Sequence, residues 1–329
     1  MVAVSKKIKL EHIALAAGLS KVTVSRALSD PDKVKIETRN KILGIAEQMG
    51  YFSNSINIKP KANKLIGIVN PDMSNPFFGE LAKIMTKISS ELEYDILIFD
   101  SYESEDIETK SIQRMISYGV DAIILSVISS DRNYNPDYLQ KLKSLNIPVI
   151  LIDREIGNSE YSGIYIDNLH CGTEIANYIN QLKYQDVVVI AGPEYSNVST
   201  DRIRGFTSVI DKTKNVQVFH ADFFMDAAYK VTKSYLRTNK ANLAFAGINN
   251  QISLGILKAC IESGLIFKQD FDLFSVDNVP YADIYGFKIP CISHNLYEIA
   301  YQAINLAIRS INKPNSDISK IIVRGEVNI

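Results

Sequence analysis

The segment 14–29, ALAAGLSKVTVSRALS, combines small apolar residues with basic and polar ones at helical spacing. An exposed helix face that carries Lys21 and Arg26 could donate hydrogen bonds in a groove of DNA. The same pattern also suits an ordinary helical corner inside a bundle, because alanine-rich amphipathic helices are mostly packing elements. Two further features help to distinguish a DNA-reading helix from a packing corner: the charge around this segment and the positions where its helices begin and end.

Charge is divided unevenly along the chain of 329 residues. Residues 1–64 hold twelve Lys and Arg against five Asp and Glu, whereas the remaining 265 residues hold 24 against 32. A basic head on an acidic body indicates that the head meets a polyanion, although a solvated lysine-rich face gives the same count.

The head has the helix boundaries of a helix-turn-helix. An apolar stripe defines a first helix that ends at Gly18, where glycine permits a positive φ. Ser20 is placed to N-cap a second helix that begins at Lys21, and a third helix is expected from Ile36 to Gly50. Three short helices with a glycine turn between the first two are typical of DNA-binding heads.

The motifs AAGLS, TVSR and the TR-containing third helix resemble the headpiece of the lactose-repressor (LacI/GalR) family of regulators. The resemblance implies that the second helix reads DNA, with base contacts from Lys21 to guanine, from Val22 to a thymine methyl group, and from Arg26. It also implies contacts that fix the register on the phosphate backbone, made by Thr23, Ser25, Lys35 and Thr38.

The segment after the head departs from the family pattern. Family members usually carry a hinge helix whose leucine wedges into the minor groove. Residues 51–64, YFSNSINIKPKANK, hold no such leucine, and Pro60 removes a backbone donor. Ile56 or Ile58 could replace the wedge, and a structureless linker is an equal alternative. We expect little protection of the amides of residues 53–64 from exchange without DNA.

Beyond residue 64, short apolar runs such as KLIGIVNPD and DVVVIAGP alternate with helical stretches. Seven such runs, with extended stretches near 161–166 and 289–293, predict parallel sheets that are covered on both faces. We expect an α/β chain in which an all-α helix-turn-helix head (1–50) and a linker (51–64) precede a core (65–329) of two doubly wound parallel-sheet lobes, similar to type I periplasmic binding proteins. The lobes are expected at 65–163 with 294–323, and at 164–293.

Catalytic motifs are absent from the sequence. It contains no GxGxxG after the first strand, no GxxxxGK[ST], no GxSxG and no HExxH. The four histidines lack metal-ligand spacing, so we expect no catalysis, no metal and no cofactor. Cys171, Cys260 and Cys291 form no CxxC pair and are expected as buried free thiols in a reducing cytoplasm. No apolar run is long enough to span a membrane.

Ligands of doubly wound folds bind at the carboxyl ends of strands, where this core carries polar and aromatic residues. Those residues resemble the sites of the family's sugar-binding cores and, more closely, of periplasmic ribose-binding proteins. The resemblance implies a sugar site formed by Asn75, Phe77, Phe78, Asp153, Arg154, Arg202, Phe223, Asn249, Asp277 and His294. His294 stands where the pattern usually has glutamine, which presents more donors and acceptors.

This set suits a neutral sugar, because phenyl rings stack on C–H faces while charged and amide groups fork onto hydroxyls. Each residue also has a simpler interpretation: the two adjacent phenylalanines as core, Asp153 with Arg154 as a surface pair, and Arg202 as a salt-bridge residue. Phe224 is assigned to core or rim. Their joint occurrence at six strand ends favours ribose or a similar monosaccharide. A sugar acid or phosphosugar is the alternative, and two aspartates count against it.

Taken together, these patterns predict a sugar-responsive transcriptional repressor of a sugar-utilisation operon. Its expected partners are double-stranded operator DNA, a sugar effector and a second copy of the chain, since one short recognition helix reads only half of a twofold site. A sugar-binding module without DNA function is the alternative from a different class. The target gene, and whether the effector releases or promotes DNA binding, stay open.

Overall fold

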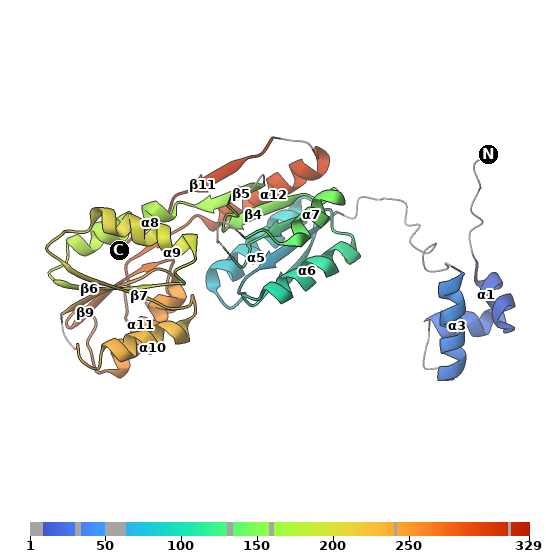
Figure 1. Ribbon diagram of the computed structural model, residues 1–329, viewed down its shortest axis with the longest axis horizontal. Helices are drawn as coiled ribbons and strands as arrows, with labels where there is room; N and C mark the ends of the chain where they lie inside the picture. The colour runs from blue at the N-terminus through green and yellow to red at the C-terminus, as the bar shows by residue number, and fades with distance from the viewer. Residues whose placement is uncertain are drawn as a thin grey trace. The chain divides into compact units, whose positions relative to one another are not determined.

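The computed structural model describes residues 9–29, 34–49, 64–129, 134–157, 161–239, 242–314 and 317–329. The chain divides into two units, 1–62 and 63–329 (Figure 1), and each is described by itself. The linker expected at 51–64 lies outside the described residues except for Lys64, and so do Ile56, Ile58 and Pro60.

The first unit is a three-helix head formed by α1 (Leu10–Ala17), α2 (Lys21–Ser29) and α3 (Ile36–Gln48). The glycine stop is confirmed, since Gly18 caps α1 with φ of +69°. The serine cap is also confirmed: Ser20 Oγ accepts a hydrogen bond from the amide of Thr23 at 3.1 Å. The three helices share one small core made of Ile13, Ala14, Ala17, Val24, Ala27, Ile42 and Ala46.

The second unit has two six-stranded sheets, one in each lobe. The first sheet contains β1 (Leu65–Asn70), β2 (Asp95–Asp100), β3 (Ala122–Leu125), β4 (Val149–Asp153), β5 (Ser162–Ile166) and β11 (Lys320–Val323). The second contains β6 (Asp186–Ala191), β7 (Asn215–His220), β8 (Leu243–Gly247), β9 (Phe271–Val276), β10 (Cys291–Ser293) and β12 (Glu326–Asn328). The α/β fold with two parallel-sheet lobes is thus confirmed.

The two sheets have equivalent strand orders, β11-β5-β4-β3-β1-β2 and β12-β10-β9-β8-β6-β7. Pairing is parallel throughout except for β12, which runs antiparallel to β10. Strand β4 in the first lobe therefore corresponds to β9 in the second, and β2 corresponds to β7. Residues that follow equivalent strands lie at the same edge of each sheet, the edge formed by the carboxyl ends of the strands. In doubly wound folds, ligands bind at this edge.

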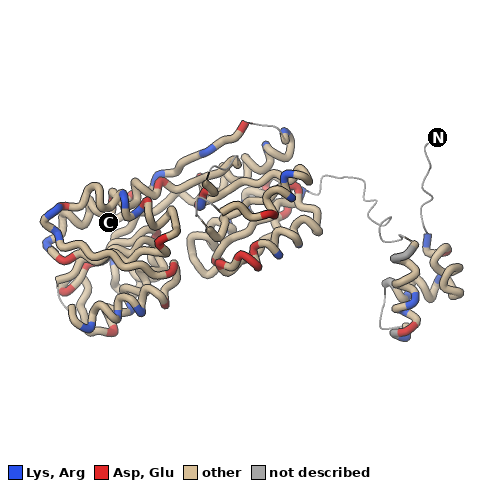
Figure 2. Tube along the Cα trace, viewed as in Figure 1, with Lys and Arg blue, Asp and Glu red and all other residues tan. Residues whose placement is uncertain are grey.

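Helices cover both faces of each sheet (Figure 1). The first lobe carries α5 (Pro76–Glu91), α6 (Glu105–Tyr118), α7 (Asp137–Ser144) and α12 (Leu296–Asn312). The second carries α8 (Asn168–Asn180), α9 (Asn197–Val209), α10 (Met225–Tyr235) and α11 (Asn250–Glu262). Charged residues lie mainly on these helices and on loops, while the strands are largely uncharged (Figure 2), as expected for sheets that are buried on both faces.

The chain crosses between the lobes three times, after β5, after β10 and after β11. The first sheet extends to Ile166, three residues beyond the expected end at 163, because β5 pairs with β4 along its length. The second lobe also includes the C-terminal β12, which the expected boundaries did not assign. Each lobe is therefore built from segments that are distant in sequence.

Candidate functional site: a pocket at the strand ends and the surface of the second head helix

The second helix of the head presents a mixed surface. Val22 is 58% exposed although it is apolar, and Arg26 is also exposed. Lys21 is not free, since its ammonium group donates to Glu11 Oε1 of α1 at 2.7 Å. Thr23 is half-buried and its hydroxyl lies 2.8 Å from that of Ser20. Contact between Lys21 and DNA would therefore replace an existing ion pair.

The remaining residues expected at the phosphate backbone differ in exposure. Lys35, just before α3, is exposed, whereas Ser25 and Thr38 are half-buried. A lysine side chain can reach a phosphate from such a position without rearrangement of the core. Lys35 is thus the most accessible of the four expected register contacts.

A pocket of about 570 Å³, part of it open to solvent, lies at the strand ends of the two lobes. All ten residues expected at a ligand site line it. It is also lined by five residues that were not in that set, namely Asp72, Glu103, Ile166, Val198 and Phe224. Phe224 is 39% exposed, which favours the rim over the core, the two places expected for it.

Two aspartates occupy equivalent positions in the two lobes. Asp153 ends β4 and Asp277 directly follows β9, and both adopt positive φ, +65° and +64°. Such a conformation is uncommon for residues other than glycine and costs free energy. Because the same conformation occurs at the same edge of both sheets, the backbone turns a carboxylate toward the pocket from each side.

Arg154 is held by the first lobe and is only 5% exposed. Its guanidinium forks onto Glu103, with Nη1–Oε2 at 2.8 Å and Nη2–Oε1 at 2.5 Å. Nη1 also donates to the carbonyls of Val127 and Ile128. The alternative of a surface pair with Asp153 is wrong in its location: Arg154 Nε lies 3.9 Å from the Asp153 carboxylate, but both side chains are largely buried.

Arg202, on α9 of the second lobe, is also 5% exposed. Its Nε donates to Asn168 Oδ1 at 2.9 Å, and its Nη1 donates to the carbonyl of Ile248. Both partners are uncharged, so the alternative of a salt-bridge residue is wrong. Asn249 N-caps α11 by accepting from the amide of Ile252 at 2.7 Å, and it donates to the carbonyl of Phe223.

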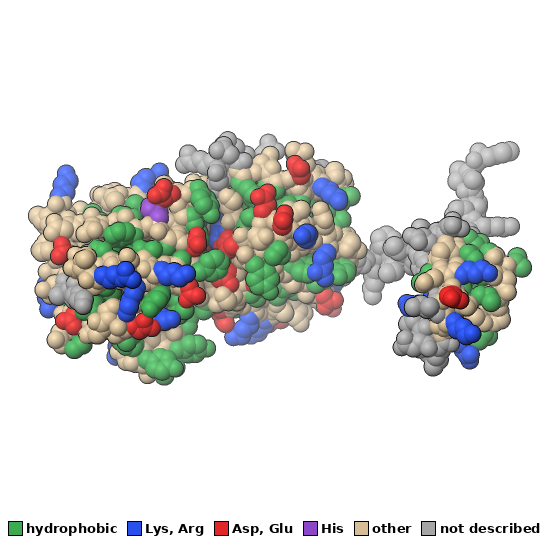
Figure 3. Space-filling model, turned by 60° about the horizontal axis from the view of Figure 1, so that its bottom comes forward, with side chains coloured by type: hydrophobic (Ala, Val, Ile, Leu, Met, Phe, Trp, Pro, Cys, Tyr) green, Lys and Arg blue, Asp and Glu red, His purple; other side chains and the backbone are tan. Residues whose placement is uncertain are grey.

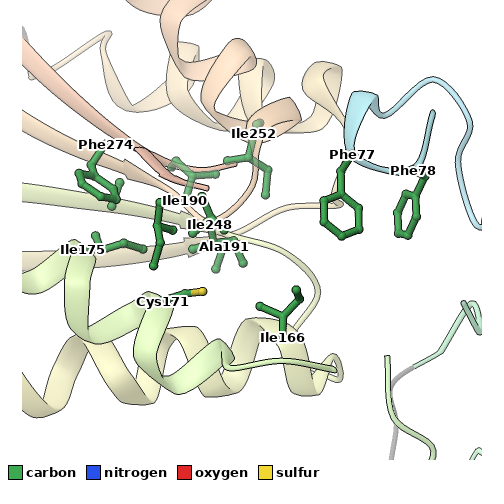
Figure 4. Packing of buried hydrophobic residues seen from close by; sticks show 14 of the residues in the cluster. Phe77, Phe78, Ile166, Cys171, Ile175, Ile190, Ala191, Ile248, Ile252 and Phe274 are labelled. Carbon is green, nitrogen blue, oxygen red and sulfur yellow. The ribbon is translucent and has the colours of Figure 1, made fainter. Parts of the chain in front are cut away.

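Aromatic rings enter the pocket from both lobes. Phe77 and Phe78 form an edge-to-face pair at the start of α5, with ring centroids 5.1 Å apart. They are 8% and 5% exposed and lie at the edge of the main hydrophobic cluster, so the core interpretation also describes them. Figure 4 shows both rings projecting from α5, apart from the tightly packed group around Ile190. Phe223 lies under Arg154, with 5.4 Å between its ring centroid and Cζ.

The pocket carries more carboxylates than cations. Four acidic side chains line it, compared with two arginines and one histidine. In the view of Figure 3, acidic side chains gather where the two lobes meet. Burial raises the pKa of Asp153 above its ordinary value, with opposing contributions from Arg154 and Arg202. The pocket therefore has an excess of hydrogen-bond acceptors.

Residue Glu103 was missed by the sequence interpretation. It follows β2 in the run DSYESED and has a positive φ of +52°. Its acidic neighbours are typical of a solvated helix start, and nothing in the run distinguishes the one carboxylate that turns inward. Its position corresponds to that of Phe223 after β7, which the equivalence of the two sheets could have indicated.

The described residues contain no candidate metal site, disulfide or membrane-spanning helix. They contain no group of three His, Cys, Asp or Glu that could hold a metal ion. All three cysteines are buried and unpaired. Within the same residues, no helix combines the length and apolar character that crossing a membrane requires.

Two family profiles match the chain. Residues 66–314 match the periplasmic binding protein domain, and residues 9–54 match the bacterial regulatory proteins of the lacI family. A strand-end pocket between two parallel-sheet lobes defines a periplasmic-binding-protein-type ligand domain, here preceded by a helix-turn-helix head. The chain belongs to the LacI family of transcriptional regulators, as its sequence resemblance predicted.

Known proteins similar to this chain agree with that assignment. A ribose operon repressor of Halalkalibacterium halodurans is 25% identical over 325 residues, covering 96% of each chain. A LacI-family regulator of Enterococcus faecalis, solved with bound ribose, matches 80% of this chain and 97% of its own at 19% identity, with a TM-score of 0.71. The Cra regulator of Pseudomonas putida, solved with fructose 1-phosphate, matches 81% and 98% at 17% identity, with a TM-score of 0.72.

Proposed function

We propose that this regulator is a repressor whose effector is a neutral monosaccharide, ribose or a close pentose or hexose analogue, bound in the pocket that the ten residues named above line. The single observation that carries this proposal is which polar side chains of the pocket already have hydrogen-bond partners in the protein and which do not. Both arginines already donate to protein acceptors, whereas no hydrogen bond of the Asp153 carboxylate is found among the described residues. Such a site needs donors from its ligand, and sugar hydroxyls supply them.

Anionic ligands fit this balance less well. A sugar acid or phosphosugar would bring further negative charge next to Asp153 and Asp277 in a partly desolvated pocket. Both Nη groups of Arg154 already donate to Glu103, so an anion at Arg154 would compete with that carboxylate. The ribose operon repressor and the ribose-bound regulator support the neutral sugar. The complex with fructose 1-phosphate keeps the phosphosugar as the second candidate.

Calorimetry with ribose, fructose, allose and a sugar acid tests the effector class. We expect at least one neutral sugar to bind with a Kd in the micromolar range, roughly −8 kcal/mol, and the acid to bind far more weakly. Fructose 1-phosphate serves as the phosphosugar probe. Binding of the acid or the phosphosugar alone, with no response to any neutral sugar, would contradict the proposal.

We infer that the pocket binds its ligand without a chemical step. His294 lies between Asp277 and Cys171, with Nδ1 2.9 Å from Asp277 Oδ1 and Nε2 3.7 Å from Cys171 Sγ. This order of groups is that of a nucleophilic triad. The Cys171 side chain, however, is fully buried and does not line the pocket, so a ligand there has no access to the sulfur. The buried free thiols also fit a cytoplasmic protein.

The proposed DNA interface distinguishes two kinds of contact. Changing Arg26→Ala is expected to cost about 1–3 kcal/mol of operator affinity and to relax one base position, because Arg26 is exposed on α2. Changing Lys35→Ala is expected to weaken all sequences alike and to reduce the salt slope by about one. Fluorescence anisotropy on operator and random DNA at several salt concentrations measures both. Equal losses for the two variants on both DNAs would overturn these roles.

We propose that two copies act together on a twofold operator, since one short recognition helix reads a single half-site. The second lobe offers an apolar surface suited to pairing, where Tyr281, Ile284 and Tyr285 are 70%, 73% and 77% exposed on one turn-rich segment. Exposed apolar side chains grouped in this way mark association surfaces. Comparison of DNA with one and with two half-sites tests the pairing.

A further inference from the structure

His294 is unusually enclosed for a residue in a ligand pocket, because its side chain is only 1% exposed. It follows β10, where the chain crosses from the second lobe to the first. Both ring nitrogens already have partners in the protein: Nδ1 lies 2.9 Å from Asp277 Oδ1, and Nε2 lies 3.7 Å from Cys171 Sγ. The ring also makes an edge contact with Phe77, whose centroid is 6.4 Å away. No ring nitrogen is left to bind a sugar.

We propose that His294 is a positioning residue that carries a positive charge at neutral pH and fixes the Asp277 carboxylate for the ligand, rather than a residue that binds the ligand itself. This inference rests on the proposed function, since it assigns a positioning role within the same site. It replaces the expectation that His294 acts as a direct ligand in place of glutamine.

The surroundings of His294 determine its charge. The titratable groups that face it are Asp277 after β9, Cys171 on α8 and, across the pocket, Asp153. Burial alone lowers the pKa of the imidazole, but the hydrogen bonds to Asp277 and Cys171 and the charge of Asp277 outweigh it and raise that pKa to about 9. Cys291 near Asp277 does not compete for protons in this range, because burial raises its pKa to about 11.

Because His294 lies at a crossing between the lobes, its ion pair with Asp277 is held rigidly. Gly325, in the third crossing, packs directly against it: a Cβ added there would lie 2.9 Å from His294 Nε2 and 2.7 Å from Ile292 Cγ1. The ring is thus held between two crossing segments and α8. One oxygen of Asp277 is bound to this fixed ring, so the other keeps a defined direction toward the pocket.

The protonation of His294 can be measured without any ligand. A proton NMR titration of the ligand-free chain follows the four histidines, and His294→Gln assigns the His294 signal by its loss. We expect that signal to titrate near pH 9, well above the ordinary value of about 6.5. Titration of His294 below pH 7 would overturn the proposal, whether or not a sugar has been found.

The effect on binding is measured by calorimetry with ribose, or with whichever neutral sugar of the earlier panel binds, between pH 6.5 and 10. The folded-state pKa is raised, so the charged form prevails below about pH 9 and is lost above it. We expect affinity to stay constant up to pH 8 and to fall by up to about tenfold between pH 8 and 10, since one proton is linked to binding.

Three variants separate His294 from other groups. His294→Gln is expected to bind more weakly at pH 7.5 and to lose the decline at high pH. Cys171→Ser is expected to keep the decline, which excludes the thiol as its source. His170→Gln, a matched change on α8 away from the pocket, is expected to behave as the unchanged chain does. A decline that survives in His294→Gln, or that disappears in Cys171→Ser, would contradict the proposal.

Discussion

Replacing Arg154 by alanine is expected to abolish effector binding and to lower the free energy of unfolding by about 3–5 kcal/mol. The guanidinium is nearly fully buried, and it supplies the fork to Glu103 and the donors to the carbonyls of Val127 and Ile128. Its removal leaves a half-enclosed carboxylate and two carbonyls without those partners. Loss of the contact with the Phe223 ring also removes a link between the two lobes.

Arg154→Lys is the matched control. Lysine keeps the charge but cannot form a two-pronged contact with a carboxylate, so we expect an intermediate loss of both properties. Urea denaturation gives the free energy of unfolding, and calorimetry with the effector gives the affinity. An alanine variant that unfolds at the same urea concentration and binds effector normally would show that the fork contributes neither stability nor pocket geometry.

Substitution of Gly172 by alanine is expected to destabilise the second lobe by about 3 kcal/mol or more, enough to prevent folding in many domains. A Cβ at this position on α8 would lie 1.9 Å from the carbonyl oxygen of Arg202 and 2.7 Å from the amide nitrogen of Phe206. These are backbone atoms of α9, so the two helices would have to separate. Arg202 would move with α9, and the pocket would lose its geometry.

Gly79→Ala is the control for this helix glycine. Gly79 lies in α5, where the nearest atom to an added Cβ is the Met73 carbonyl oxygen at 3.6 Å, an ordinary contact. Alanine there is expected to raise stability by roughly 0.5–1 kcal/mol, because it restricts the unfolded chain. Urea midpoints of the two variants measure the contrast. Similar midpoints for both would mean that α8 and α9 can separate at little cost.

The helices of the head and most strands of the core could be predicted because their patterns are local. Gly18 and Ser20 act within one turn of their own positions. Strand β7 was missed, since the edge strand NVQVFH alternates between exposed and half-buried positions and lacks a continuous apolar run. Strands β11 and β12 at the C-terminus were missed as well; they are short edge strands whose side chains are mostly exposed.

The residues of the pocket could be named from the sequence because they resemble the family's sugar-site pattern, and the ends of parallel strands, where they stand, meet at one edge. Their partners could not be named. The fork between Arg154 and Glu103 joins two loops that are 51 residues apart, and the ion pair between Lys21 and Glu11 joins two helices. Such pairs depend on side-chain direction in the folded protein, which no spacing along the chain encodes. The enclosure of His294 was hidden for the same reason.

The three crossings between the lobes have a consequence for how the protein is made on the ribosome. The first sheet is complete only when β11 has been synthesised, and α5 is covered only when α12 packs against it. The apolar face of α5, with Leu81, Met85 and Ile88, therefore emerges about 200 residues before its cover. The second sheet is likewise incomplete until β12 has been synthesised. Neither lobe can complete its sheet before β11 and β12 have been synthesised, so the two lobes reach their final structure almost together.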